Sequence, residues 1–312
     1  MEKVRAKWHT LATTRKEGIM ELHAPATFNG AKLLGVFDNG TSEWHEVRAD
    51  GIGGSEIGTI LGLNRWESAF YLHHLKTGNL PQKVIDSFPA DLGNILEPVI
   101  MGPLLKRQHP EWEVFTTGTY QHPTIPYLHA NPDGLTQVDG EWVIVEAKTS
   151  RNYWDEVPPS YLAQVQFYMM VMGVKRAVIV GLIAMDWVEY WVEADEFEQD
   201  VMKQAAERFW LGVKNDTAPA WDGSESTYEA VRELHPDIDD TEVEIDGLHY
   251  LPAAQAAFDK AESELKQMKS EVLSIMGRAK HAYIEHEGAT IRVASRQARG
   301  QGRPFLVVKK GK

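Results

Sequence analysis

The chain has 312 residues, 43% of them hydrophobic, and a formal net charge of −13 at pH 7, which suits one large or two modest globular domains. No apolar run reaches the ~18 residues of a membrane helix, and residues 1–30 lack the apolar core of a signal peptide. The chain contains no cysteine, which excludes disulfides and thiolate metal sites and fits the reducing cytoplasm.

The charge is unevenly distributed along the chain. Residues 193–246 hold 17 acidic and 4 basic residues and so account for the whole net charge of −13. Residues 278–312 hold 9 basic and 2 acidic residues, a net charge of +7. Salt screens exposed charges beyond roughly 8 Å, so an acidic chain can still bind nucleic acid through a local basic surface. The basic tail is either such a surface or simply solvated.

Hydrophobic periodicity predicts an α/β (α+β) fold. Residues 1–44 are expected to be a variable leader with a short hairpin at 31–40. In chain order, the next predicted elements are helices at 55–61, 68–77 and 92–108, strands at 114–120, 127–131 and 141–148, a helix at 161–172, strands at 177–182 and 187–192, and a helix at 196–213. Helices and strands mix without strict alternation, which predicts a central mixed sheet flanked by helices over residues 45–215.

The remaining residues are predicted to form an extension. Residues 216–250 are acidic and turn-rich and are interpreted as a linker or surface excursion. Residues 251–312 are expected to form a helix and a β-hairpin. The helix carries a stripe of apolar residues that packs on the core, on another helix or in a dimeric coil: Phe258, Ala261, Leu265, Met268, Val272 and Ile275. The hairpin pairs 290–293 with 305–308, around an Arg- and Gly-rich loop at 296–303 that would grip phosphates or a partner protein.

The most informative residues lie in the middle of the chain. Asp133 sits in an Asn-Pro-Asp-Gly turn signature, and Glu146 and Lys148 end an apolar strand that begins at Glu141. Side chains alternate along a strand, so Glu146 and Lys148 share one face, and a hairpin would bring Asp133 beside Glu146. Such a trio can hold a divalent cation on hard oxygen ligands and place an amine beside the water that the cation activates. The alternative is an ordinary hairpin whose Glu and Lys pair with each other in solvent.

Together with four further blocks in order, this stretch resembles the PD-(D/E)xK nucleases, and within them the YqaJ-type viral recombinases related to the exonuclease of phage lambda. Arg48 precedes a Gly-Gly-Ser block at 51–58. The remaining blocks are 61–68 with Lys76-Thr77-Gly78, the glutamate-bearing segment 93–98, and the glutamine-bearing segment 161–169. The resemblance covers about residues 45–215.

The resemblance implies a catalytic site with a restriction-endonuclease-like core. Mg²⁺, or Mn²⁺ in its place, would be bound by Asp133, Glu146 and the backbone carbonyl of Ala147, with Glu97 joining them and two ions in the site. Lys148 would orient or deprotonate the attacking water, and orientation is favoured because a lysine base needs a depressed pKa. Gln164 would hydrogen-bond near that water; the alternative is a helix-surface amide.

The same resemblance implies DNA contacts. Arg48 and Ser55 would bind a terminal 5′-phosphate, although Ser55 can equally serve as a helix N-cap. Arg65 and Trp66 would contact or wedge the duplex end, unless Trp66 packs in the core, and Arg151 is a further contact candidate.

The implied activity is a 5′→3′ exonuclease on linear double-stranded DNA that leaves 3′ single-stranded tails for phage-type recombination. Its implied partners are DNA ends, a single-strand annealing protein and copies of itself in a ring, in the cytoplasm of a bacterial host. The alternatives are an endonuclease or single-strand nuclease of the RecB or Cas4 kind, without the iron–sulfur cluster because cysteine is absent, or a non-catalytic DNA-binding module.

Overall fold

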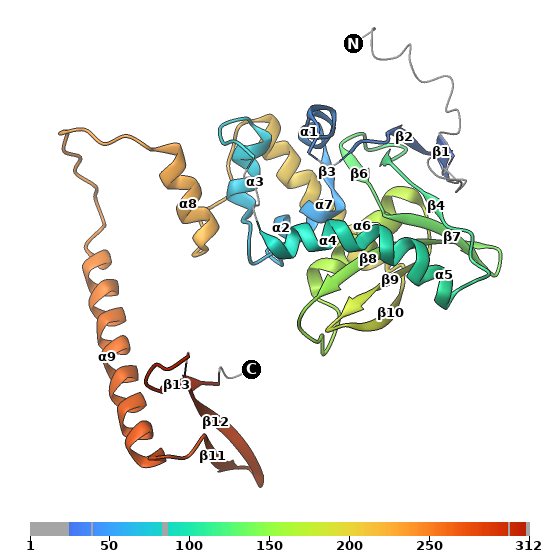
Figure 1. The fold of residues 1–312 in the computed structure, drawn as a ribbon. Coiled ribbons are helices and arrows are strands. Elements are labelled where there is room, and N and C mark those ends of the chain that lie inside the picture. Colours follow the sequence, from blue (N-terminus) through green and yellow to red (C-terminus); the bar gives the residue numbers. More distant parts are fainter. Residues whose placement is uncertain (1–24, 39, 83–86, 299, 310–312) are drawn as a thin grey trace. The chain divides into compact units, whose positions relative to one another are not determined.

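The computed structural model describes residues 25–38, 40–82, 87–298 and 300–309 (Figure 1). The chain divides into two compact units, Met1–Ile238 and Asp239–Lys312, called here the N-terminal unit and the C-terminal unit. Most of the predicted leader, residues 1–24, lies outside the described residues.

A mixed five-stranded sheet forms the centre of the N-terminal unit. Its strands run in the order β10-β9-β8-β7-β4. The bounds are Phe115–Thr116 (β4), Gly134–Val138 (β7), Glu141–Ser150 (β8), Arg176–Ile183 (β9) and Asp186–Glu193 (β10). Strands β8 and β9 are parallel and the other neighbours are antiparallel. The predicted mixed sheet is therefore confirmed.

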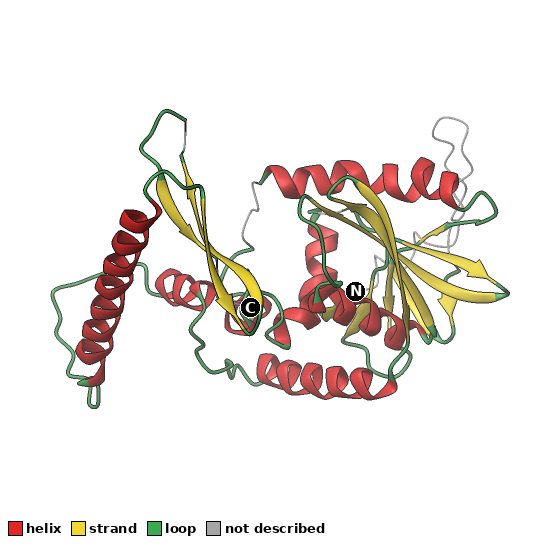
Figure 2. Cartoon of the chain, turned by 90° about the horizontal axis from the view of Figure 1, so that it is seen from below, coloured by secondary structure: helices red, strands yellow, loops and turns green. Residues whose placement is uncertain are grey.

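Helices cover both faces of this sheet (Figure 2). Val143, Val145 and Ala147 of β8 belong to the cluster that includes Ile100 and Leu105, on the side of helix α4 (Phe88–Val99). Ile144 belongs to the larger core cluster that includes helix α6 (Pro159–Met172). Because both faces of β8 are covered, its sequence is a nearly continuous apolar run, as expected for a central strand. Polar side chains at its end then stand out as functional candidates.

Helix α6 connects the parallel strands β8 and β9 and buries nine of its 14 residues. It contacts helices α2 (Gly54–Ile60) and α7 (Glu196–Lys214), and it packs against strands of both sheets. The second sheet has the order β1-β2-β5-β6-β3. Its bounds are Thr27–Phe28 (β1), Ala31–Gly35 (β2), Ile52–Gly53 (β3), Thr119–Gln121 (β5) and Leu128–Ala130 (β6).

The hairpin predicted at 31–40 is wrong. Strand β2 pairs instead with β1 on one side and β5 on the other. The turn between β1 and β2 is Asn29-Gly30, and both residues have positive φ, 48° and 88°, as a type I′ hairpin turn requires. The Asn-Gly signal was therefore present in the sequence, one turn earlier than the predicted hairpin.

The helix predicted at 92–108 begins earlier and is interrupted. Helix α4 passes into a π-helical turn, Ile100–Leu104, and then into helix α5, Leu105–Gln108. Pro98 and Pro103 lie inside this run. A proline lacks the N–H that the regular i→i−4 ladder needs, so a local π turn is the expected accommodation.

Two helices were missed by the sequence analysis, α1 (Ser42–Ala49) and α8 (Glu225–Leu234). Helix α8 lies inside the stretch interpreted as a linker or surface excursion. Its buried residues, Thr227 and Ala230, are small, so the acidic segment carries no visible stripe of large apolar residues. It packs on helix α3 (Ala69–Lys76).

The C-terminal unit consists of helix α9 (Tyr250–Met276) and a three-stranded sheet in the order β11-β12-β13. The strands are His281–His286 (β11), Ala289–Gln297 (β12) and Phe305–Val308 (β13). The predicted pairing of 290–293 with 305–308 is wrong. Residues 290–292 pair with β11, and β13 pairs with Ala294 to Gln297. Strand β12 runs to Gln297 and β13 begins at Phe305, so the connection falls at 298–304 and not at the predicted 296–303. How the apolar stripe of α9 packs stays a prediction.

Candidate active site

The hairpin of β7 and β8 brings Asp133 to Glu146 as the spacing predicts. Gly134 pairs with Val145 across the two strands, which places Asp133 next to the end of the strand that carries Glu146. Asp133 Oδ2 accepts a hydrogen bond of 2.8 Å from the backbone N–H of Ala147. The turn itself is fixed from outside, because the Thr117 hydroxyl donates to the carbonyl of Pro132.

A chain of hydrogen bonds runs from Lys148 through Glu146 into helix α6. Lys148 Nζ donates to Glu146 Oε1 at 2.6 Å, and Gln164 Nε2 donates to the same oxygen at 2.8 Å. Gln164 Nε2 also donates to the hydroxyl of Tyr168 at 3.0 Å. Lys148 Nζ lies 5.0 Å from the centre of the Tyr161 ring. Glu146 and Lys148 therefore share the face that looks toward α6, and they are not solvated.

Three carboxylates influence one another in this cluster. Burial raises the pKa of Asp133 well above its ordinary value, and the carboxylates of Glu146 and Glu97 raise it further. Burial and Glu146 likewise raise the pKa of Glu97, which lies in the last turn of α4 against β8. Burial alone would lower the pKa of Lys148, but Glu146 and Asp133 hold it above its ordinary value. Lys148 is therefore a stable cation beside an excess of negative charge.

The donor set fits a hard divalent cation. Glu146 is 2% exposed, and its Oε2 is buried without a hydrogen-bond partner in the described structure. A buried carboxylate oxygen without a partner costs free energy, and an oxygen-liganded cation would satisfy it and reduce the repulsion among Asp133, Glu146 and Glu97. Within the described ranges, no three His, Cys, Asp or Glu side chains already form a ligand cluster. Asp133, Glu146 and the Ala147 carbonyl could therefore hold a cation with water, and Glu97 could join only by moving.

A cavity of about 580 Å³ opens beside this cluster, and it brings several predicted residues together. Gln164 and Tyr161 line it from α6, and Ser55, Arg65 and Trp66 line it from the opposite side. Trp66 is 78% exposed, so the alternative that it packs in the core is wrong. The Arg65 guanidinium lies 4.4 Å from the centre of its ring. Arg151 lies elsewhere, at a second cavity that shares Thr149, Ser150 and Asn152 with the first.

Arg48 and Ser55, predicted as a phosphate site, lie together. Both terminal nitrogens of Arg48 are 3.4 Å from Ser55 Oγ, and the guanidinium lies 4.7 Å from the centre of the Trp44 ring. Ser55 is not the N-cap of its helix: Gly53 occupies that position, and Glu56 accepts from its N–H at 2.9 Å. The hydroxyl of Ser55 is therefore not used as a cap.

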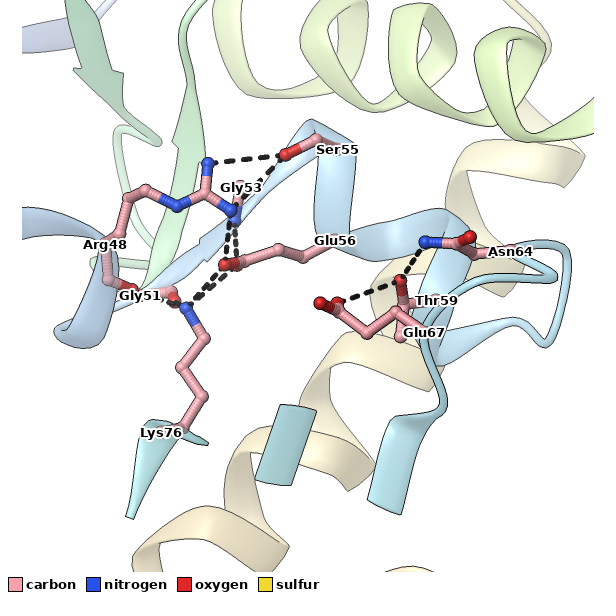
Figure 3. A network of polar contacts seen from close by, with 9 residues as sticks. All are labelled: Arg48, Gly51, Gly53, Ser55, Glu56, Thr59, Asn64, Glu67 and Lys76. Atoms are coloured by element: carbon pink, nitrogen blue, oxygen red, sulfur yellow. Dashed lines mark hydrogen bonds and ion pairs between the residues drawn. The ribbon is translucent and has the colours of Figure 1, made fainter. Parts of the chain in front are cut away.

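Sequence reasoning assigned no role to Glu56 and Lys76, which Figure 3 shows beside Arg48. Glu56 accepts from Arg48 at 2.7 Å, and Lys76 donates to both of its oxygens at 2.9 and 2.8 Å. Two sequence signals were present: Glu56 and Lys76 lie in blocks 51–58 and 76–78 of the family resemblance, and Glu56 follows Gly53 by three residues, the spacing at which a glutamate reaches back to an N-cap.

Gly54 permits the close approach of α2 to α6. A Cβ at Gly54 would lie 2.4 Å from Cε1 of Tyr168. The Gly54→Ala variant should therefore lower the free energy of unfolding by about 1–3 kcal/mol through overpacking. Urea unfolding followed by tryptophan fluorescence measures this in the N-terminal unit, since all ten tryptophans precede residue 222. Gly102→Ala is the control, because no atom lies within 4 Å of its Cβ; equal losses in both variants would contradict the packing explanation.

The class of protein follows from this geometry. A mixed sheet in which Asp133 adjoins the strand of Glu146 and Lys148, with a glutamine of a flanking helix bonded to that glutamate, is the arrangement of the PD-(D/E)xK nuclease fold. Residues 43–175 match the YqaJ-like viral recombinase domain, the family that the motifs of this segment resemble. The uncharacterized protein YqaJ of Bacillus subtilis (strain 168) is 29% identical over 267 residues, which cover 78% of this chain and 80% of that protein.

Two solved structures are similar in fold. An alkaline exonuclease from Laribacter hongkongensis, LHK-Exo, is 18% identical with a TM-score of 0.45, covering 57% of this chain and 94% of that chain. A phage related exonuclease from Haemophilus somnus 129PT is 13% identical with a TM-score of 0.42, covering 56% of this chain and 100% of that chain. Among the described residues, no helix is both long and apolar enough to span a membrane.

Proposed function

We propose that this protein is a metal-dependent DNA exonuclease that degrades linear double-stranded DNA from the 5′ end and leaves 3′ single-stranded tails for phage-type recombination. The observation that carries the proposal is the buried cluster of Asp133, Glu146 and Lys148, with an unsatisfied oxygen on Glu146. A structural ion pair has no need of three mutually repelling carboxylates, whereas phosphodiester hydrolysis needs a cation site beside a positioned amine.

Mg²⁺, with Mn²⁺ as a substitute, is the proposed cofactor, and two ions per site are expected. When bound, a divalent cation lowers the pKa of water and neutralises charge that develops on the phosphate. Asp133, Glu146 and the Ala147 carbonyl would bind it, and Glu97 would join them from α4. Lys148 Nζ donates to Glu146 Oε1 at 2.6 Å, so its proposed role is that of a positioned cation that orients the water and stabilises the phosphate.

Gln164 is proposed to orient the attacking water. Its Nε2 is committed to Glu146 and Tyr168, and the amide can donate to a carboxylate only through this nitrogen. Its oxygen is therefore left as an acceptor, and Gln164 lines the cavity. A water held by this oxygen and by Lys148 would stand beside the carboxylates that bind the cation.

End recognition is proposed to rest on Arg48 and Ser55. Ser55 lines the same cavity as Gln164, so a 5′-phosphate held by these two side chains would belong to the strand that enters the catalytic cluster. A ring of copies threaded by DNA would add processivity without high affinity per subunit. The proposal includes four further parts: a ring of copies, an annealing-protein partner, use of the basic tail as a DNA surface, and a place in the cytoplasm of a phage-bearing host.

The experiment is a cleavage assay on linear duplex labelled at one end, with and without a 5′-phosphate, in Mg²⁺. Closed circular duplex and single strands are assayed beside it. The proposal expects digestion of linear duplex alone, from phosphorylated 5′ ends, and none in the presence of a chelator. Cutting of circles or preference for single strands would identify a different nuclease of the same superfamily. Binding without cleavage under any divalent metal would identify a DNA-binding module.

Trp66 is expected to contact DNA. Because its ring is 78% exposed, Trp66→Ala should change the free energy of unfolding by less than about 0.5 kcal/mol. Base–aromatic stacking contributes about 1–3 kcal/mol, so the affinity for duplex ends, measured by fluorescence anisotropy with Ca²⁺ in place of Mg²⁺, should fall about tenfold. Trp221 is equally exposed, at 78%, and lies outside the cavity; an equal loss in Trp221→Ala would contradict a specific contact.

A further inference from the structure

Behind Arg48 lies an ion pair that is almost completely withdrawn from water. The Glu56 side chain is 5% exposed and the Lys76 side chain is 2% exposed, with 2.8 Å between Lys76 Nζ and Glu56 Oε2. The Arg48 side chain, by contrast, is 33% exposed. A buried ion pair contributes little net stability, since the desolvation of two charges offsets their attraction. This pair therefore calls for a role other than holding the fold together.

The pair joins three helices at one point (Figure 3). Lys76, the last residue of α3, donates to the carbonyl of Arg48 at the end of α1 and to the carbonyl of Gly51 at 2.7 Å. Glu56 of α2 accepts from the guanidinium of Arg48 and from the N–H of Gly53. Both the backbone and the side chain of Arg48 are thus held by this pair, as is the turn that leads to Ser55.

The charges of this group do not cancel. Arg48 and Lys76 are cations and, among the described residues, Glu56 is the anion that bonds to both, which leaves one positive charge within this bonded group. Glu67 accepts from Thr59, acts on the group only at longer range, and has a pKa raised by burial and by Glu56. Burial alone would raise the pKa of Glu56, but Lys76 and Arg48 hold it below its ordinary value, so it is an anion at neutral pH. Lys76 bonds both carboxylate oxygens, and Arg48 shares only one of them. The uncompensated charge therefore lies at the guanidinium of Arg48, whose side chain is partly exposed.

Three contacts fix the orientation of that guanidinium. One nitrogen is bonded to Glu56, the carbon stands over the Trp44 ring, and both terminal nitrogens lie near Ser55 Oγ. A cavity of about 90 Å³ adjoins Arg48, Gly53, Gly54 and Ser55, and Ser55 also lines the larger cavity that contains Gln164. A guanidinium fork held this way loses little entropy when it binds a phosphate.

We propose that Glu56 and Lys76 are positioning residues that hold Arg48 and Ser55 as a preformed receptor for the terminal 5′-phosphate monoester of DNA. The inference rests on the proposed function, in which Arg48 and Ser55 contact that phosphate. It adds that recognition of the phosphorylated end depends on two residues that never touch DNA. Without the pair, Arg48 remains present but is free to turn away from Ser55.

The test is the double variant Glu56→Gln/Lys76→Met, which removes one charge of each sign and keeps an acceptor for the N–H of Gly53. The ratio of kcat/KM for 5′-phosphorylated over 5′-hydroxyl duplex should fall about tenfold, as expected for loss of charge-assisted hydrogen bonds. The KM for the phosphorylated duplex should rise, with kcat unchanged. Arg176→Gln/Glu193→Gln removes a more exposed pair, with 3.2 Å between Arg176 Nε and Glu193 Oε1, and should leave the ratio unchanged.

The Arg48→Ala substitution distinguishes a positioning role of Glu56 and Lys76 from a merely structural one. That change alone should lower the ratio, and adding it to the double variant should lower the ratio no further, because both act through the same guanidinium. Glu56→Asp keeps the charge but withdraws the carboxylate by one methylene. It should lower the ratio as well, and it serves if the double variant does not fold.

The outcomes distinguish this inference from the function on which it rests. If the unaltered protein cleaves phosphorylated and hydroxyl ends equally, the end recognition in the proposed function is overturned. If the unaltered protein discriminates, and a folded Glu56→Gln/Lys76→Met or Glu56→Asp protein discriminates equally well, only the positioning role is overturned. Losses that add fully with Arg48→Ala would overturn it too.

Discussion

Asp133→Asn is expected to abolish metal binding and cleavage while making the metal-free protein more stable. An asparagine oxygen can still accept the N–H of Ala147, which Asp133 accepts at 2.8 Å, so the hairpin is retained. A bound cation supplies several kcal/mol of charge stabilisation in the transition state, so kcat should fall by about 10³-fold or more. Single-turnover cleavage and isothermal titration with Mn²⁺ measure the two losses.

The stability gain follows from the raised pKa of Asp133. Because the pKa of Asp133 is higher in the folded than in the unfolded protein, ionisation of Asp133 destabilises the folded state. This destabilisation grows as the pH rises from the unfolded pKa to the folded pKa, and it reaches its full size above the folded pKa. The Asn variant lacks this destabilisation, so in chelator its Tm should exceed that of the unaltered protein at neutral pH and approach it in acid. Added Mn²⁺ should raise the Tm of the unaltered protein alone.

Asp139→Asn is the matched control for this prediction. Asp139 lies in the turn of the same hairpin with a φ of 54°, which asparagine tolerates. It should leave cleavage, Mn²⁺ binding and the pH profile of the Tm unchanged. An Asp133→Asn protein that binds Mn²⁺ normally would remove Asp133 from the ligand set.

Lys148→Met should separate chemistry from metal binding. The ammonium donates to Glu146 Oε1 at 2.6 Å, where it competes with a cation for the carboxylate. Removal of the ammonium should leave the affinity for Mn²⁺ unchanged or increased. The kcat should fall by about 10²–10³-fold, because the positioned positive charge is lost. Titration calorimetry and single-turnover rates on linear duplex provide both values.

Lys214→Met controls for the loss of a lysine beside an aromatic ring. Lys214 Nζ lies 4.8 Å from the centre of the Trp210 ring, much as Lys148 Nζ lies 5.0 Å from that of Tyr161. The Lys214 variant should cleave normally. If Lys148→Met lost metal affinity as well, Lys148 would be needed to hold the carboxylates in place, and its proposed part in catalysis would be unsupported.

The candidate catalytic trio was predictable because its geometry is local. Asp133 and Glu146 lie on one hairpin, whose register follows from the turn and the apolar pattern. The two-residue period of a strand then places Glu146 and Lys148 on one face. The prediction of Gln164 depended on the resemblance to the family. The period of a helix shows which residues share a face, but it does not show which residue of β8 that face will contact.

Other features depended on contacts between distant segments. Lys76 meets Glu56 twenty residues away and the carbonyl of Arg48 twenty-eight residues away, and no local pattern encodes these pairs. Helix α8 was missed because a helix that packs on α3 through Thr227 and Ala230 needs no large apolar stripe. The exposure of Trp66 was equally undetermined, since tryptophan occurs both in cores and at binding surfaces.

The sequence by itself determined the class of fold and the hairpin that carries Asp133, Glu146 and Lys148, because these depend on backbone periodicity and on residues close together in the chain. The tertiary structure alone decided which side chains share a cavity, which oxygen of Glu146 lacks a partner, and how Glu56 and Lys76 hold Arg48. Those features depend on burial and on charges that meet only when α1, α2, α3 and α6 come together. Burial changes the free energy of each charged group by amounts that no local pattern reveals.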